Sequence, residues 1–190
     1  GSGDILYDHS GNGNHGTIHG ATWVFDYDVN LHLGANLVSF YGLPEDSSVP
    51  NVLAPLSDNV SGVITEGGAC SLTPQGWVGS QCTLHCENGY WLIMNADDIL
   101  PIDDAMTCNN EYCLASGANL ISFPSPDTIA VSPAIPDDME SCISGIITEG
   151  GACSQLNPFE WVGSKCELMG RQGYWLISEC DDCFSFDLSS

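Results

Sequence analysis

Four residues near the start of the chain have side chains that could bind a transition metal. Asp8, His9, His15 and His19 fall within twelve positions, and imidazole and carboxylate groups are common ligands of such metals. The residues between them are mostly Gly, Asn and Ser, which are typical of polar turns. The pattern therefore favours a polar turn followed by a strand, and a metal site is the alternative.

Two acidic pairs offer oxygen ligands for calcium. Asp97 and Asp98 form the first pair, and Asp181 and Asp182 form the second, 84 residues further along. Calcium binds carboxylate oxygens in loops of this kind, although solvated turns are the commoner origin of such pairs. Ca²⁺ is therefore the one cofactor for which the sequence gives a candidate site.

Catalytic patterns are missing from the sequence. Glu66 and Glu149 could be taken for an acid/base pair, but each occupies the same place in one of two repeats, which is not how two carboxylates flank one bond. A glutamate that lies in a turn before Gly-Gly is the expected role. The sequence contains no G-x-S-x-G and no H-E-x-x-H. We therefore expect a protein that is not an enzyme.

Ten cysteines in 190 residues indicate disulfides and an oxidising compartment. Cys70 and Cys82 flank a turn almost symmetrically, and Cys153 and Cys166 repeat this arrangement, so each pair is expected to form a cross-strand disulfide. The other six allow 15 pairings, which the sequence leaves open. These six are Cys86, Cys108, Cys113, Cys142, Cys180 and Cys183.

The net charge limits the partners of the protein. The chain carries 25 acidic residues against two basic ones, Lys165 and Arg171, which gives a formal charge of −23. Nucleic acid is excluded as a partner because no group of cations could replace the counterions of the phosphates. Divalent cations or a basic partner suit this charge better. No apolar run approaches the length of a membrane span, and a hydrophobic content of 43% predicts a packed core.

A repeated sequence accounts for most of the chain. The segment SGVITEGGAC at 61–70 returns as SGIITEGGAC at 144–153, and the matches GANL[VI]SF, WVGS[QK]C and GYWLI extend the repeat in both directions. The offset changes from 83 to 84 residues between Cys153 and Trp161, so one residue is inserted there, in a turn. The two copies therefore encode one structural unit each.

The repeated segments predict a mostly β fold. ANLVSF and SGVITEG are short, rich in β-branched residues and bounded by Gly, Pro and Asp, as strands are. A short helix is expected near 47–53, with Ser47 or Ser48 as its N-cap and Pro50 in its first turn. The sequence thus predicts two tandem, homologous β-sandwich or barrel-like units, each with one short helix and stapled by disulfides. Their expected limits are 31–107 and 108–190, after an N-terminal segment 1–30.

Two resemblances place the chain among secreted proteins. The motifs N-L-[IV]-S-F and G-Y-W resemble tandem β-rich modules of large secreted or cell-surface bacterial proteins, over about 155 residues. YDHSGNGNHGTIHGATW resembles the opening of laminin-G-like jelly-roll domains, over about twenty residues. The first resemblance implies an extracellular location and a tandem architecture. The second covers too few strands to carry over a sugar or calcium site.

The segment Thr17–Phe25, TIHGATWVF, is expected to form an apolar strand that has no partner of its own. If it joins the sheet of a neighbouring copy, Ile18, Trp23 and Phe25 would fill a groove there. The sequence therefore predicts a non-catalytic extracellular structural protein, a self-associating subunit of a cell-surface fibre or appendage. The alternative is a carbohydrate-binding or adhesive module of a larger secreted protein, with glycan as its partner.

Overall fold

Each repeat folds around a five-stranded antiparallel sheet. The structure is a computed structural model, and it describes residues 5–18, 23–56 and 58–189. The strand order is β4-β9-β6-β7-β8 in the first unit and β12-β18-β14-β15-β16 in the second, so the two sheets have the same topology. The strands of the first sheet are β4 (Gly34–Ser39), β6 (Val60–Thr65), β7 (Gly68–Thr73), β8 (Gly76–Gly79) and β9 (Gly89–Met94). Those of the second are β12 (Gly117–Ile121), β14 (Ile143–Thr148), β15 (Gly151–Asn157), β16 (Glu160–Gly163) and β18 (Tyr174–Ser178).

A short helical segment covers the inner face of each sheet. These segments are α1 (Val49–Val52) with the 3₁₀-helix η1 (Ala54–Leu56), and α2 (Val131–Ala134). Pro50 lies in the first turn of α1, as predicted, but the side chain of the N-cap residue Ser48 makes no capping hydrogen bond. The mostly β fold with short helices and disulfides is confirmed.

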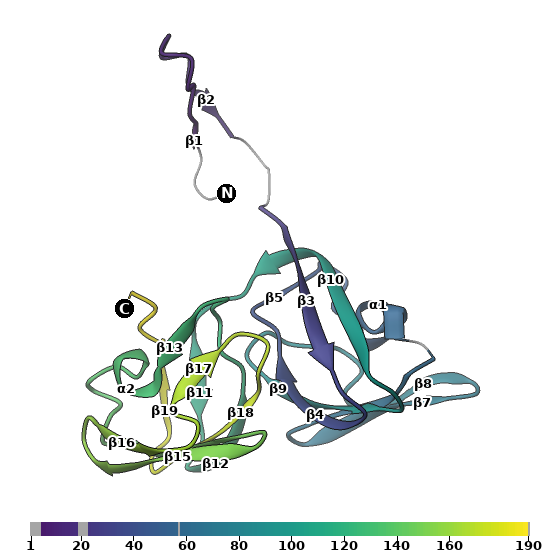
Figure 1. The fold of residues 1–190 in the computed structure, drawn as a ribbon, viewed down its shortest axis with the longest axis vertical. Coiled ribbons are helices and arrows are strands. Elements are labelled where there is room, and N and C mark those ends of the chain that lie inside the picture. The colour runs from purple at the N-terminus through teal and green to yellow at the C-terminus, as the bar shows by residue number, and fades with distance from the viewer. Residues whose placement is uncertain (1–4, 19–22, 57, 190) are drawn as a thin grey trace.

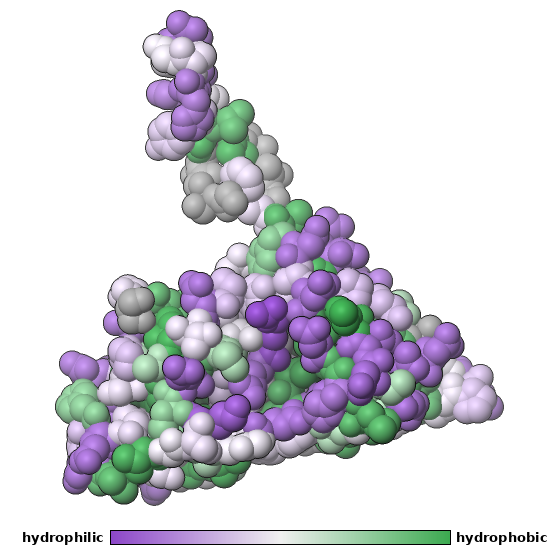
Figure 2. Space-filling model, in the orientation of Figure 1, coloured by the Kyte–Doolittle hydropathy of each residue, from purple (hydrophilic) through white to green (hydrophobic). Residues whose placement is uncertain are grey.

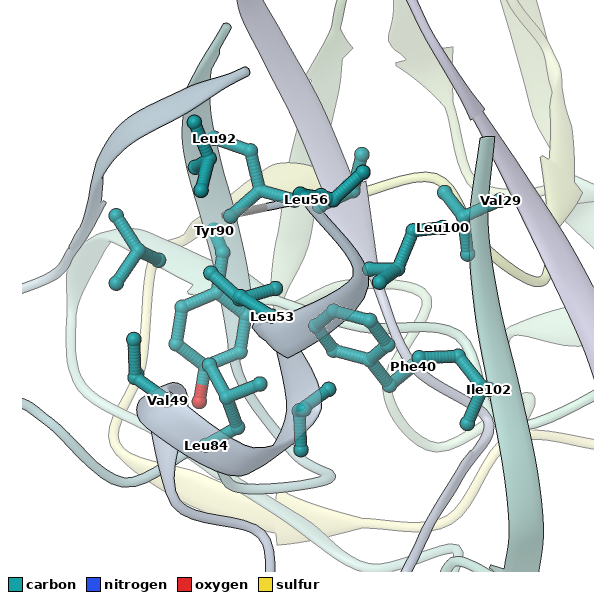
Figure 3. Close-up of a cluster of buried hydrophobic side chains, with 14 of the residues drawn as sticks. Val29, Phe40, Val49, Leu53, Leu56, Leu84, Tyr90, Leu92, Leu100 and Ile102 are labelled. Atoms are coloured by element: carbon teal, nitrogen blue, oxygen red, sulfur yellow. The ribbon is translucent and has the colours of Figure 1, made fainter. Parts of the chain in front are cut away.

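The core of the first unit lies between the sheet and its helical segment. Figure 3 shows Tyr90 and Leu92 of β9 beside Leu53 and Phe40, and these four side chains are at most 1% exposed. The second unit repeats this core with Tyr174, Leu176 and Phe123. Burial of each such side chain contributes about 1.5–3 kcal/mol to folding, so the matching apolar positions of the repeats explain why both copies fold alike.

In each unit, a strand that precedes the first repeated segment pairs with a strand that follows the five-stranded sheet. In the first unit, β3 (Phe25–Leu31) pairs with β10 (Asp98–Thr107), which also pairs with β5 (Gly42–Leu43). In the second, β11 (Tyr112–Leu114) pairs with β19 (Asp182–Phe184), and β13 (Thr128–Ala130) pairs with β17 (Glu167–Met169). The first unit therefore begins at Phe25 rather than at Leu31, because the alternating sequence FDYDVNL turns Tyr27, Val29 and Leu31 inward.

The N-terminal residues form a hairpin that stands away from the body (Figure 1). Its strands β1 (Ile5–Leu6) and β2 (Gly16–Thr17) pair with each other. We name residues 5–18 the N-terminal arm.

The single strand expected over Thr17–Phe25 is wrong. Thr17 ends β2, Ile18 and Trp23 lie outside strands, and residues 19–22 lie outside the described part of the chain. Phe25 pairs with Ala105 of its own unit, and its ring stacks on those of Tyr27 and Tyr41. The side chain of Phe25 thus packs against the core of its own unit.

Five disulfides join all ten cysteines, and four of them lie within one unit. The fifth, Cys86–Cys108, links the first unit to the residue at which the expected range of the second unit begins. Cys70 bonds Cys82 and Cys153 bonds Cys166, which are the two pairs expected from the hairpin pattern. The three pairs that the sequence left open are Cys86–Cys108, Cys113–Cys183 and Cys142–Cys180. The two cysteines of the C-x-x-C motif thus bond two different partners, so this motif anchors the C-terminal strand β19 rather than forming one local bridge.

Candidate functional site

The aspartate and histidines of the N-terminal arm form a local turn. The carboxylate of Asp8 accepts hydrogen bonds from the backbone N–H groups of Ser10 and Asn14. The side chain of Ser10 and then these backbone bonds hold the pKa of Asp8 below its usual value. The Asp8 N–H donates to Nδ1 of His15 at 3.0 Å. His19 lies outside the described residues. Within the described ranges, no three His, Cys, Asp or Glu side chains gather closely enough to hold a metal ion.

The two acidic pairs hold loops in place. Oδ1 of Asp97 accepts the backbone N–H of Leu33 at 2.7 Å, and Oδ1 of Asp181 accepts that of Ser116 at 2.6 Å. Leu33 and Ser116 are equivalent residues of the two repeats, just before β4 and β12. The second member of each pair, Asp98 or Asp182, accepts the N–H of the residue that follows it. The candidate calcium ligands are thus spread over two separate loops and already serve as hydrogen-bond acceptors.

The repeated TEGG sequence is a two-residue turn. Thr65 pairs with Gly68 at the end of the β6–β7 hairpin, which leaves Glu66 and Gly67 as the turn. Gly67 has φ +81° and its equivalent Gly150 has φ +79°, a conformation that favours glycine. The turn lifts the side chain of Glu66 beyond the end of its sheet, and the same turn in β14–β15 does so for Glu149.

These two glutamates reach across to the other unit. Oε2 of Glu149 accepts the backbone N–H of Leu37 at 2.9 Å, and Oε2 of Glu66 accepts that of Leu120 at 3.1 Å. Leu37 and Leu120 are equivalent residues, 83 positions apart in the edge strands β4 and β12. The two contacts are therefore reciprocal, and they relate the two units by an approximate two-fold axis.

Backbone hydrogen bonds continue this reciprocal junction. The N–H of Ser39 donates to the carbonyl of Arg171 at 3.2 Å, and the equivalent N–H of Ser122 donates to the carbonyl of Glu87 at 3.1 Å. A Cβ added at Gly173 would lie 2.7 Å from the carbonyl oxygen of Val38, so only glycine allows this approach. Each unit therefore covers the open edge of the other, which is how sheets avoid uncontrolled pairing.

One contact of the junction has no counterpart. Nε2 of His32 lies 2.6 Å from Oε1 of Glu149, whereas the residue equivalent to His32 is Ala115. The buried amide of Asn36 positions His32, since it accepts the N–H of His32 and donates to its carbonyl, both at 2.8 Å. Hydrogen bonds to the Leu33 carbonyl and to the Glu149 carboxylate raise the pKa of His32 above its ordinary value. This pair can therefore respond to pH.

A groove of about 520 Å³ opens beside this pair. Asp28, His32, Glu149 and Arg171 are among the residues that line it, so it contains one of the two basic residues of the chain. The equivalent pocket on the other side of the junction measures about 90 Å³ and has Glu87 in place of Arg171. The guanidinium of Arg171 donates to the carbonyl oxygen of Asp28 at 3.2 Å, which ties the groove wall to β3.

The tryptophans of the repeats divide into two kinds. Trp77 and Trp161 pack against the cores of their units. Trp91 and Trp175 are half-buried and lie on the opposite face of each sheet, away from the core residue Tyr90 and its equivalent Tyr174. Trp91 and Trp175 are therefore the two repeat tryptophans that lie outside the cores of their units.

No protein-family model, curated protein or solved structure matches this chain. None of the described helices is long and apolar enough to cross a membrane.

The sequence did not indicate His32, Asn36 or Arg171 as junction residues. His32 and Arg171 are replaced by Ala115 and Glu87 in the other repeat, so the repeat pattern carries no signal for them. Asn36 does recur as Asn119, and this pair of asparagines could have been recognised as buried clamps, because an amide in an otherwise apolar strand needs partners when it is buried.

Proposed function

We propose that this chain is a non-catalytic extracellular structural protein that joins other copies through its N-terminal arm, as a subunit of a cell-surface fibre or appendage. The observation that carries the proposal is the exposure of three large apolar side chains on the arm. Ile5, Leu6 and Tyr7 are 47%, 64% and 61% exposed, on a hairpin that projects from the body (Figure 1). A two-stranded hairpin is only marginally stable in water, so a docking partner would stabilise it.

The body of the molecule supports a structural role. Five disulfides within 190 residues are typical of oxidising compartments, such as the outside of the cell. The reciprocal contacts of Glu66 and Glu149 join the two units, so that the body can transmit load as one piece.

The arm suits head-to-tail association. Backbone groups on the open edges of β1 and β2 are available to pair with a sheet edge of a neighbour, such as the outer strands β8 or β16. An arm on one copy and an acceptor edge on the next are different surfaces, and contacts of that kind do not close by symmetry. Such contacts generate a fibre.

Deletion of the arm tests this function. Removing residues 1–18 should abolish filaments in electron micrographs, while the near-ultraviolet circular dichroism and melting temperature of the body stay unchanged. The double variant Leu6→Ser/Tyr7→Ser should have the same effect, and Leu188→Ser, at a residue 38% exposed outside the arm, is the matched control. Filaments that form without the arm, or a full chain that never forms filaments, would contradict the proposal.

An adhesive, glycan-binding module is the second candidate. The observation that favours it is the pair of half-buried tryptophans, Trp91 and Trp175, on outward sheet faces, because sugar rings stack on indole faces. Binding of the chain to an insoluble neutral polysaccharide, lost in Trp91→Ala/Trp175→Ala, would support this function over assembly.

A further inference from the structure

The side of each five-stranded sheet that faces away from its helix is apolar. In the first unit, Leu37, Trp91, Ile64 and Ala69 lie directly opposite one another on the neighbouring strands β4, β9, β6 and β7. Because paired residues share a face, these side chains form one row across the sheet. Ile64 is 45% exposed, and Val78 on β8 is 60% exposed. We name this side of both sheets the outer face.

The second unit repeats the row. Leu120, Trp175, Ile147 and Ala152 are its members, on β12, β18, β14 and β15. Ile147 is 47% exposed. The two rows are related by the same approximate two-fold axis as the Glu66 and Glu149 contacts, so the molecule presents the same apolar surface twice.

The outer face is also nearly uncharged. The five strands of the first sheet contain no Asp, Glu, Lys or Arg, and those of the second contain only Glu160, on the edge strand β16. The whole chain has 27 such residues, 25 of them acidic. A single carboxylate over two complete sheets distinguishes this surface from the rest of a strongly acidic molecule.

The figures place the outer face on one side of the molecule. Strands β15 and β12 of the second sheet and β4, β7 and β8 of the first lie along the base of the view, with α1 and α2 above them (Figure 1). Hydrophobic residues reach this base in the space-filling view (Figure 2). The outer faces of both units therefore point away from the helices in the same general direction.

We propose that a second copy of this chain packs on the outer face, sheet against sheet. Aliphatic side chains such as Ile64, Ile147 and Val78 interdigitate well between two sheets about 10 Å apart. Leu37 and Leu120 are only 3% exposed because the other unit covers them at the junction, so β4 and β12 are left out of the estimate. The remaining four strands, about 4.8 Å apart and about 18 Å long, give roughly 350 Å² per sheet, or roughly 700 Å² per copy. One side of a standard stable interface buries about the same area.

Charge also favours a second copy as the occupant. Two molecules that each carry −23 repel one another, and the outer face lets them meet with only the Glu160 carboxylate of the edge strand β16 on the contacting sheets. A basic protein would find only this one carboxylate on the face to pair with. The approximate two-fold axis allows both units of one copy to face both units of the other, as in a symmetric dimer.

The contact is separate from the one proposed for the N-terminal arm. The arm would join copies head to tail, whereas the outer face would join them in pairs. The full chain and the chain without residues 1–18 should therefore both contain the face-to-face dimer, and failure of either proposal leaves the other measurable.

Sedimentation velocity of the full chain and of the chain without residues 1–18 tests the inference. The arm-deleted protein should be a dimer at micromolar concentrations and dissociate on dilution, with the tryptophan emission shifting to longer wavelength as Trp91 and Trp175 become hydrated. Ile64→Glu/Ile147→Glu should weaken the dimer at least tenfold. Ile99→Glu is the matched control, because Ile99 is 53% exposed on β10, outside both five-stranded sheets.

Three outcomes would overturn the inference. The first is an arm-deleted protein that stays monomeric at all concentrations and salt levels. The second is equal dimerisation of the double variant and the control, with unchanged melting temperatures showing that both are folded. The third is a monomer that binds an insoluble neutral polysaccharide through Trp91 and Trp175, which would assign the outer face to a glycan instead.

Discussion

The carboxylate of Glu149 accepts the backbone N–H of Leu37 at 2.9 Å, across 112 residues of sequence. The equivalent contact of Glu66 with Leu120 has the opposite direction, from the first unit to the second. One duplicated turn thus supplies both halves of a junction. A duplicated module can gain such a symmetric contact with itself, because a residue that is the same in both copies can reach the other copy from each side.

Removing either glutamate should weaken this junction. Glu149→Ala and Glu66→Ala each delete one hydrogen bond to a charged acceptor and leave a backbone N–H without its partner, and Glu149→Ala also removes the contact with His32. We expect each substitution to lower the free energy of unfolding by about 1–2 kcal/mol in urea titrations. Glu45→Ala, which removes the same charge from an exposed loop, is the control. An equal loss in the control would show that the junction contacts contribute nothing specific.

The stability of the junction should depend on pH through His32. Hydrogen bonds to the Leu33 carbonyl and to Glu149 raise the folded-state pKa of His32 above the unfolded value of about 6.5. Folding therefore favours protonated His32. This stabilisation is fully present below pH of about 6.5 and is lost as the pH rises through the raised pKa.

Melting temperatures measured between pH 5.5 and pH 8.5 check this dependence. The difference between the wild-type protein and His32→Ala should be largest at the acidic end and shrink toward pH 8.5. Asp97 also faces His32, so Asp97→Asn should reduce the same difference slightly. A wild-type advantage that grows with pH would contradict the assigned direction of the pKa shift.

Much of the fold could be predicted because it is encoded locally. The strands around Ile64 and Trp91, the turn at Glu66 and the Cys70–Cys82 disulfide all follow from patterns within about a dozen residues. The strand β3 could also have been predicted, since FDYDVNL alternates apolar and polar residues. It was missed because it precedes the longest matches between the two repeats and its equivalent in the second unit, around Tyr112, is shorter.

The junction could not be predicted because it depends on contacts between distant residues. His32 and Glu149 are 117 positions apart, and nothing near His32 indicates an acidic partner. The pairing of Cys113 with Cys183 likewise depends on β11 lying beside β19. Spacing along the chain does not determine which strands become neighbours.

Glu140 should be important for the second unit alone. Its carboxylate is 1% exposed and accepts hydrogen bonds from the side chain of Gln155, from the N–H of Phe159 and from Nε1 of Trp161. These donors belong to the turn that contains the extra residue of the second repeat. The carboxylate thus holds the longer turn in place.

Glu140→Ala should leave those partly buried donors without their shared acceptor and cost about 2–3 kcal/mol of unfolding free energy. Urea titration followed by tryptophan fluorescence measures the loss. Glu160→Ala is the control in the same turn, because the carboxylate of Glu160 bonds only the exposed side chain of Asn157, and we expect a change below about 0.5 kcal/mol. Similar losses of unfolding free energy in the two variants would show that Glu140 does not stabilise this turn more than Glu160 does.

The disulfides should contribute different amounts to the free energy of unfolding, according to the lengths of the loops that they close. Cys113 and Cys183 are 70 residues apart, whereas Cys70 and Cys82 are 12 apart. A disulfide that closes a longer loop removes more chain entropy from the unfolded state. We therefore expect Cys113–Cys183 and Cys70–Cys82 to stabilise the folded state by roughly 4 and roughly 3 kcal/mol respectively. Cys113→Ser/Cys183→Ser should therefore melt at a lower temperature than Cys70→Ser/Cys82→Ser.

Peptide mapping without reduction should first establish that each variant keeps its other four disulfides. The two variants can be compared directly, because both replace two cysteines of one unit by the same residue. If Cys70→Ser/Cys82→Ser melts first, loop closure cannot be the main contribution. The stabilisation would then come from packing, since Cys70 lies in the core at 0% exposure while Cys113 is on the surface.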